Sequence, residues 1–342
     1  MLVPISIMLV VLGTAPAIGS EIRTASTKAA VDKGLRRIEQ GSANYTTHRQ
    51  CFSCHHQALP VLCMTSARAR GFAVEPIRIR EQIEFTLNTF AGKEDQIAKG
   101  QGIAGGNTMA VYALMTLEAG GHPADKTTSA LIQYLLARQR ADGSWPALAQ
   151  RPPMEGSAFT NNALALRSLR AYGRNCAKGN EALLARIDKA MSKGRDWLKQ
   201  NNPVTTEDKI SYLRGLVWAD ADGKQVEVAR NTLLKSQRED GSWSQLDTLP
   251  GDAYATGTVL VALWSSGMPS TSPAYQRGSD YLLRTQRPDG AWLVTTRSKP
   301  VQTFFDNGDP GDKSQFISFA ATNWAVLALL ESFPIQLSIL PW

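Results

Sequence analysis

The sequence is poor in the residues that most often carry chemistry, because it contains only four cysteines and four histidines among 342 residues. It also lacks a basic block, although its formal net charge is +7. Lysines and arginines are scattered among acids at helical spacing, which argues against a nucleic-acid-binding surface. With 43% apolar residues, the chain has the composition of a globular protein with a well-buried core.

The N-terminus has the features of an export signal. An apolar run extends from Leu2 to about Leu12, and small residues follow up to a cleavage position near Ser20. The run is short for a membrane span, but no Lys or Arg precedes it, so an uncleaved N-terminal anchor is the alternative. We expect a signal peptide over residues 1–20 and an exported, periplasmic or extracytoplasmic protein. The mature chain, 21–342, is then one domain without a stable membrane span.

Three nearly identical segments mark an internal repeat. They read QRADGSW (Gln139–Trp145), QREDGSW (Gln237–Trp243) and QRPDGAW (Gln286–Trp292). Their spacing indicates a unit of about 49 residues with one blurred copy that ends near Gln200. Each segment ends an amphipathic helix, Asp-Gly breaks that helix, and a more uniformly apolar helix follows. Helices that are apolar on most sides are buried.

The same alternation of amphipathic and apolar helices runs through the whole chain, starting with an amphipathic helix over residues 26–45. The sequence therefore predicts an all-α (α/α)6 toroid of six helical hairpins, with six outer and six inner helices. All inner helices then point the same way, and their N-terminal ends gather at one mouth. The inner helices are predicted over residues 53–71, 104–121, 158–173, 206–220, 252–267 and 318–333.

The segment RGSDYLLRTQRPDGAW (Arg277–Trp292) combines a basic residue and Gly, an aromatic and aliphatic pair, and then Gln, Asp-Gly and Trp. This order resembles the QW repeat of the squalene–hopene cyclase and oxidosqualene cyclase superfamily. The resemblance implies the toroid of terpene cyclases and protein prenyltransferases over nearly the whole mature chain. We expect the repeated Gln and Trp residues to be structural, because Gln caps helix ends and Trp packs between units.

Cyclase chemistry needs a strongly acidic carboxyl group in an apolar cavity, which the family provides with an Asp-x-Asp-Asp run. This sequence has no such run. The nearest carboxylates are Asp252, at the head of an inner helix, and Asp220–Asp222, at an inner helix end. We expect Asp252 to be an N-cap, with a catalytic acid as the alternative. The zinc ligands of prenyltransferases have no equivalent either, because Cys176 has no neighbouring His.

Three of the four cysteines and three of the four histidines lie between Asn44 and Met64. Cys51, Cys54 and His55 form the C-x-x-C-H pattern of covalent c-type haem attachment, with two thiols on the haem vinyl groups and the imidazole on iron. By chance, a chain of this composition would contain the pattern about five times in ten thousand. The sequence therefore predicts haem c at the start of the first inner helix, over the mouth of the toroid.

Other interpretations of these residues stay open. A zinc ion could take Cys51, Cys54, His55 and His48, although the spacing is not that of a finger. Cys51 and Cys54 could form a redox disulfide, although the chain lacks the βαβ pattern of thioredoxins. In an oxidising compartment, Cys63 could pair with Cys54 or with Cys176.

The sixth iron ligand is a separate question. A helical His56 projects about 100° away from His55, and His122 lies at the far end of an inner helix. His48, Met109 and Met154 are therefore the candidates, together with an open iron site.

The starts of the inner helices also predict which residues surround the mouth. We expect Asn161, Asp252, Tyr254 and Asn323 at its rim and Trp324 just inside, above an apolar wall that its own side chains could fill. One functional hypothesis is an exported haem oxidoreductase or electron-transfer protein that binds an apolar, isoprenoid-like molecule and meets a redox partner protein. The alternatives are a non-catalytic binding or scaffold toroid and a divergent terpene cyclase.

Overall fold

The computed structural model of the chain describes residues 15–299 and 304–336. Most of the predicted signal segment, residues 1–14, lies outside the described residues, and α1 begins at Ala15. Within the described ranges the chain forms thirteen α-helices and no β-strand. No helix of this part is long and apolar enough to cross a membrane.

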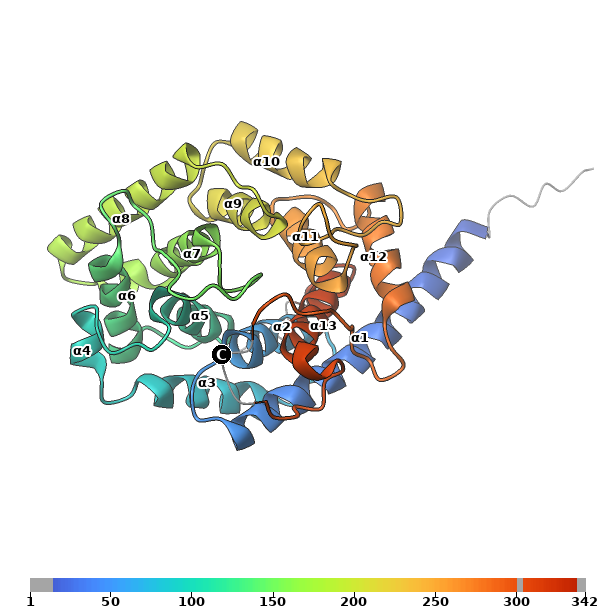
Figure 1. Ribbon diagram of the computed structural model, residues 1–342, viewed down its shortest axis with the longest axis horizontal. Coiled ribbons are helices and arrows are strands. Elements are labelled where there is room, and N and C mark those ends of the chain that lie inside the picture. The colour runs from blue at the N-terminus through green and yellow to red at the C-terminus, as the bar shows by residue number, and fades with distance from the viewer. Residues whose placement is uncertain (1–14, 300–303, 337–342) are drawn as a thin grey trace, which may run out of the picture.

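Twelve of the helices form an outer and an inner ring, six in each, and Figure 1 shows the two rings. The outer helices are α1 (Ala15–His48), α3 (Pro76–Phe90), α6 (Lys126–Arg138), α8 (Glu181–Gln200), α10 (Gly223–Lys235) and α12 (Pro273–Thr285). The inner helices are α2 (Leu59–Arg68), α5 (Gly106–Ala119), α7 (Ala158–Cys176), α9 (Thr206–Trp218), α11 (Ala253–Ser265) and α13 (Gln315–Leu330). The predicted toroid of six hairpins is confirmed.

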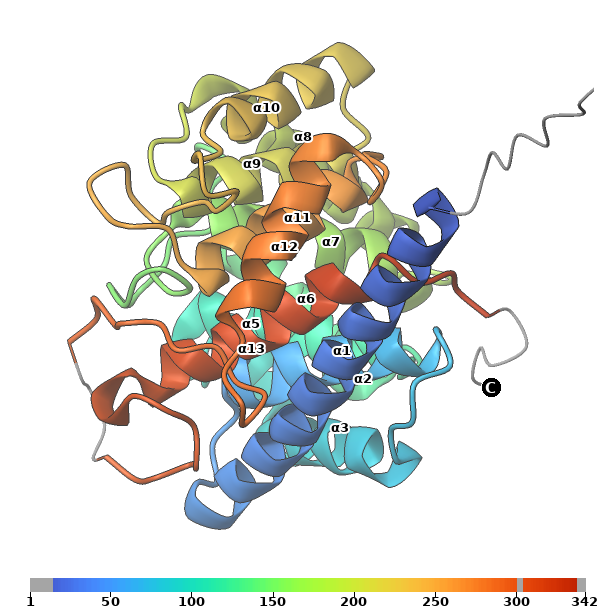
Figure 2. The ribbon, with the colours of Figure 1, turned by 90° about the vertical axis from the view of Figure 1, so that its right-hand side faces the viewer.

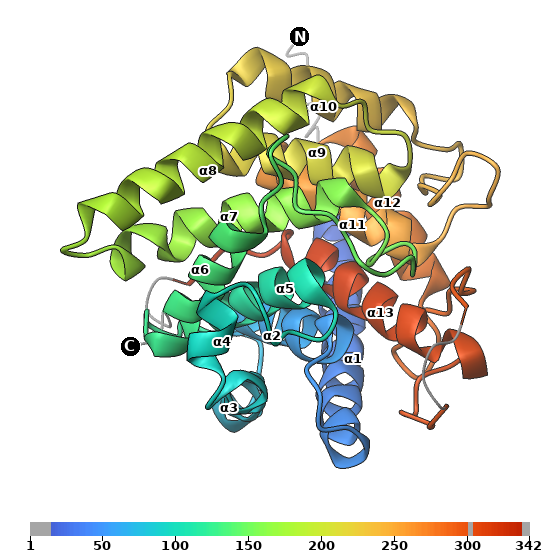
Figure 3. The ribbon, with the colours of Figure 1, turned by 60° about the vertical axis from the view of Figure 1, so that its left-hand side comes forward.

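The inner ring is closed. Each inner helix contacts the next one along the chain, and α13 returns to contact α2. Figure 2 shows α1 running past α12 and α13 on the outside, and Figure 3 shows α8 outside α7 and α10 outside α9. The inner helices are buried on nearly all sides, which explains their uniformly apolar sequences.

The repeated Gln and Trp residues connect neighbouring hairpins, as the last repeat illustrates. The side-chain amide of Gln286 donates to the carbonyl oxygen of Gly290 at 3.0 Å and to that of Ala30, in α1, at 2.9 Å. The indole of Trp292 is buried and donates to the carbonyl oxygen of Leu282 at 2.8 Å. Gln286 therefore joins the last outer helix to the first and helps to close the ring. Equivalent bonds are made by Gln139, Trp145, Gln237 and Trp243.

The turn of each repeat lies directly against the next outer helix. Gly290 has a φ of +89°, and a Cβ atom there would lie 2.5 Å from the carbonyl oxygen of Lys33. Only glycine fits this approach without strain. The Asp-Gly of the repeat therefore does more than break a helix, because it sets the distance between successive hairpins.

Three short elements were not predicted. They are the helix α4 (Glu94–Ala98), the 3₁₀ turn η2 (Asp312–Ser314) and the π-helix η1 (Cys54–Ala58). The π-helix leads directly into α2 and contains two residues of the C-x-x-C-H motif. π-Helical turns are rare and occur frequently at functional sites.

Candidate functional site

A cavity of about 690 Å³ opens at the N-terminal ends of α2, α5 and α13. Cys51, Cys54 and His55 all line this mouth cavity, and the motif lies at the N-terminal end of the first inner helix, α2. The other walls come from the end of α3, the start of α5, the Arg151–Glu155 turn and the start of α13. The volume is in the range of pockets that bind cofactors and drug-sized ligands.

The π-helix sends two consecutive histidines into different surroundings. His55 lines the cavity, whereas His56 is fully buried between the rings of Tyr45 and Phe319, each with a centroid 4.5 Å away. Asn307 donates from Nδ2 to Nε2 of His56 at 2.9 Å. His56 therefore belongs to the core and not to the cavity.

His55 is positioned to bind a ligand through one ring nitrogen. Its Nδ1 lies 3.2 Å from Oγ of Ser53 and 3.4 Å from Sγ of Cys54, so Nε2 is the nitrogen left for a ligand. Burial, together with the nearby cation of Arg151, lowers the pKa of His55 to about 3. The imidazole is therefore neutral, which is the form that binds metal ions.

All four cysteines are free thiols in the structure, so none of the predicted disulfide alternatives is formed. Cys51 is exposed and Cys54 is buried. Sγ of Cys54 donates to Oε1 of Glu155 at 3.4 Å, and Oε2 of Glu155 pairs with the guanidinium of Arg151. Burial, with the carboxylate of Glu155 beside it, raises the pKa of the Cys54 thiol.

Of the four residues of the zinc alternative, Cys51, Cys54 and His55 line the cavity and His48 does not. Over residues 15–299 and 304–336, no three His, Cys, Asp or Glu side chains are arranged to hold a metal ion. His48 is exposed, stacks on Phe305 with ring centroids 4.9 Å apart, and does not line the cavity. Of the predicted sixth ligands, Met109 and Met154 do line it.

The five residues predicted at the mouth do not line the large cavity. Asp252 is the N-cap of α11, since its Oδ1 accepts from the backbone N–H of Ala255 at 2.8 Å. Asn161 and Asn323 are buried within α7 and α13. Tyr254 and Trp324 line a smaller, separate space at the centre of the toroid. The starts of inner helices do gather at one end, but the open volume lies beside α2 and α5 and not beside α7 and α11.

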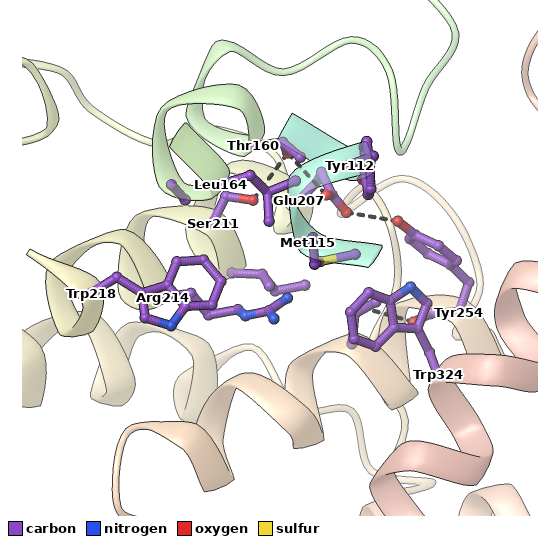
Figure 4. A pocket seen from close by; sticks show the side chains of 13 residues that line it. Tyr112, Met115, Thr160, Leu164, Glu207, Ser211, Arg214, Trp218, Tyr254 and Trp324 are labelled. Carbon is purple, nitrogen blue, oxygen red and sulfur yellow. Dashed lines mark hydrogen bonds between the residues drawn. The ribbon is translucent and has the colours of Figure 1, made fainter. Parts of the chain in front are cut away.

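The central chamber has a volume of only about 20 Å³, room for about one water molecule (Figure 4). Its walls come from α5, α7, α9, α11 and α13. Glu207, in the first turn of α9, accepts from the hydroxyls of Tyr254 and Thr160, each at 3.0 Å. Burial raises the pKa of Glu207 to about 7.

Arg214 fills much of the chamber's apolar side. Its guanidinium carbon lies 4.6 Å from the ring centroid of Trp218 and 5.3 Å from that of Trp324, and Figure 4 shows it between the two rings. In the part of the chain that the structure describes, Nε of Arg214 and Nε1 of Trp324 have no hydrogen-bond partner. The protein's own cation therefore occupies an aromatic cage, and the wall is filled by its own side chains.

Solved structures of similar shape include a type II terpene cyclase. The type II terpene cyclase MstE from Scytonema superposes with a TM-score of 0.58 over 91% of this chain and 100% of that one, at 12% identity. A protein from Actinoplanes superposes with a TM-score of 0.57 over 90% and 99%, also at 12% identity. Residues 200–337 match the squalene-hopene cyclase C-terminal domain. The chain therefore has the α/α toroid fold that type II terpene cyclases also have.

Two curated proteins have sequence similarity to this chain. The drimenyl diphosphate synthase of Streptantibioticus cattleyicolor is 27% identical over 192 residues, which cover 54% of this chain and 34% of the relative. The squalene–hopene cyclase of Bradyrhizobium diazoefficiens is 25% identical over 273 residues, covering 66% of this chain and 39% of the relative. The chain thus spans between a third and two fifths of the length of these relatives.

The matched domain and the C-x-x-C-H motif occupy different parts of the toroid. Residues 200–337 include Glu207 and Asp252, whereas the motif lies in the first hairpin. Glu207 was not predicted from the sequence, in which Asp252 and Asp220–Asp222 were the carboxylates expected nearest to the cavity. The available signal was an acid in the first turn of a predicted inner helix, the same position at which capping residues occur.

Proposed function

We propose that the protein is an exported c-type haem protein in which the squalene-cyclase-like toroid holds one haem in the mouth cavity. One observation carries the proposal: Cys51, Cys54 and His55 line a single cavity of about 690 Å³ together with Met109 and Met154. The fold therefore brings three distant segments to one place. These segments carry the residues that attach haem and two residues able to complete its coordination.

The residues present fit the group. The thiols of Cys51 and Cys54 would each add across a vinyl group, with sulfur bonded to one carbon and the proton transferred to the other. Nε2 of His55 would face the iron, because Ser53 and Cys54 engage Nδ1. Phe52, a buried side chain of the cavity wall, would exclude water from the porphyrin face. Haem, when bound, supplies one-electron redox chemistry.

The small central chamber argues against chemistry on a substrate held inside the toroid. A volume of about 20 Å³ leaves no room for an isoprenoid chain beside Glu207 and Arg214. The toroid then serves as a rigid frame that presents the cofactor at its mouth, where a redox partner protein can approach it.

Covalent attachment can be tested directly. Expressed in a bacterial periplasm with the cytochrome c maturation machinery, the full chain is expected to retain haem through acid–acetone extraction and denaturing electrophoresis. The double variant Cys51→Ser, Cys54→Ser should lose the haem peroxidase stain, whereas Cys63→Ser, a buried cysteine outside the motif, should keep it. A wild-type chain that binds zinc and no haem overturns the proposal.

A divergent terpene cyclase is the second candidate, and Glu207 is the observation that favours it. This buried carboxyl group is held by two hydroxyl donors in an aromatic chamber, and its raised pKa suits a proton donor. The chamber would have to open around Arg214 to admit a substrate. We expect no cyclised product from squalene. Formation of a product by the wild type that is lost in Glu207→Gln would establish the cyclase instead.

A further inference from the structure

The side chains around the mouth cavity are of two kinds. Much of the wall is apolar, and the apolar side chains include Phe52, Phe90, Ile103, Met109, Phe316 and Ile317. Three lysines that line the same cavity, Lys93, Lys299 and Lys313, are exposed. An apolar wall beside several cations is the arrangement that complements an amphipathic anion.

Among the described residues, no carboxylate neutralises the positive charge of the three lysines. Lys93 donates from Nζ to the carbonyl oxygen of Thr89 at 3.2 Å, and within the described residues none of the three lysines forms an ion pair with a carboxylate. Among the described side chains that line the cavity, Glu155 is the one carboxylate, and Arg151 is paired with it. The cavity therefore has an excess of cations.

The lysines also come from three separate segments. Lys93 precedes α4, Lys299 lies in the loop after the last QW repeat, and Lys313 lies in η2. The fold thus gathers them around one opening although they are far apart in sequence.

We propose that Lys93, Lys299 and Lys313 form an anion-binding edge, which takes the carboxylates of a ligand whose apolar body lies in the cavity. The inference rests on the proposed function, under which that ligand is haem. Haem carries its two propionates on the side of the porphyrin away from the vinyl groups. Thioether bonds at Cys51 and Cys54 and ion pairs at the lysines would then hold different groups of the same cofactor.

The test uses the full chain carrying Cys51→Ser and Cys54→Ser, made without haem maturation, so that nothing is covalently attached in the cavity. Binding of protoporphyrin IX, a free dicarboxylate, is compared with binding of its dimethyl ester by fluorescence titration. We expect the free acid to bind about tenfold more tightly at low ionic strength, and salt to reduce the difference.

Lysine variants test whether these three residues bind the carboxylates, as opposed to the net charge of the whole protein. Adding Lys93→Gln, Lys299→Gln and Lys313→Gln should reduce the affinity for the free acid to that for the ester and leave ester binding unchanged. A control with the same change of net charge replaces the exposed lysines Lys178, Lys189 and Lys224 and should alter neither affinity. Equal affinities of acid and ester, or an equal loss in the control, would overturn the inference.

A further titration distinguishes a porphyrin dicarboxylate from an isoprenoid diphosphate as the anionic ligand. Farnesyl diphosphate has an anionic head on an apolar chain, and its tight binding with no porphyrin binding would overturn the assignment to a dicarboxylate porphyrin. The outcomes also separate this inference from the proposed function. Lysine-dependent porphyrin binding without covalent haem in the wild type defeats only the proposed function, whereas covalent haem without an acid–ester difference defeats only the lysine edge.

Discussion

The thiol of Cys54 donates to Oε1 of Glu155 across 3.4 Å, although the two residues are 101 positions apart in the chain. This bond fastens the start of the first inner helix to the Arg151–Glu155 turn, which carries Met154. The turn is held by the isolated bridge between Arg151 and Glu155. The Glu155 carboxylate therefore links one wall of the mouth cavity to the start of the first inner helix.

Replacing that carboxylate should destabilise the haem-free chain. Glu155→Ala leaves the Cys54 thiol without its acceptor and Arg151 without its partner, so we expect a loss of about 1–3 kcal/mol in the free energy of unfolding. Glu155→Gln keeps an oxygen for the thiol and should lose less. Urea unfolding provides the comparison. If Glu155→Ala and Glu155→Gln lower the free energy of unfolding equally, the contact between Cys54 and Glu155 contributes nothing to stability.

The sixth iron ligand can be assigned from spectra of the holoprotein. Met109→Leu or Met154→Leu should abolish the absorption and magnetic signatures of methionine ligation, because both side chains line the cavity. His48→Gln should leave them unchanged, since His48 stacks on Phe305 outside the cavity. A changed spectrum in His48→Gln, together with unchanged spectra in both methionine variants, would contradict this placement of the ligand.

Closure of the ring can be tested at the last repeat. Gln286→Ala removes two hydrogen bonds, one of which crosses from the end of α12 to Ala30 in α1. We expect a cost of about 1–3 kcal/mol in the free energy of unfolding. Gln101→Ala, at an exposed loop position, is the matched control and should cost less than about 0.5 kcal/mol. A Gln286 variant as stable as this control would mean that its bonds do not hold the ring.

Glu207 should make stability depend on pH. Its pKa is about 7 in the folded protein, above the ordinary 4.5, so between these values the folded state holds a proton that the unfolded state has released. The free energy of unfolding therefore falls as pH rises through this window. His55 and His56 act in the opposite direction, because burial lowers the pKa of each.

The contribution of Glu207 is isolated by comparing wild type with Glu207→Gln. From pH 5 to pH 8, the free energy of unfolding of the wild type should fall by about 2 kcal/mol relative to that of Glu207→Gln. Loss of a hydrogen-bond acceptor in the variant adds a constant that does not depend on pH. A difference that stays constant over this range would show that Glu207 titrates alike in both states.

The helices could be predicted from the sequence, because the signals for each helix lie close together in the chain. The inner helix predicted over residues 206–220 is α9 over Thr206–Trp218, and the Gln and Trp residues have the structural contacts expected of them. Periodicity, Asp-Gly breaks and the repeat length all lie within a few turns of chain.

The sites were harder to predict, because each is formed by side chains that are far apart in the sequence. The opposite directions of His55 and His56 come from a π-helical turn that no pattern predicts. An acid in the first turn of an inner helix looks like a helix-end residue, and only the fold shows that Glu207 points to the centre of the toroid while Asp252 caps α11. The open volume beside α2 arises from loops whose packing the repeats do not specify.

Intact-mass measurement with peptide mapping, on the full chain made with the haem maturation machinery, tests haem attachment most directly. The chain should gain the mass of one haem per molecule, and the peptide that carries Cys51 and Cys54 should hold it through both sulfurs. A chain at its unmodified mass, with both cysteines reacting as free thiols after denaturation, would contradict the assignment of a c-type haem to the mouth of the toroid.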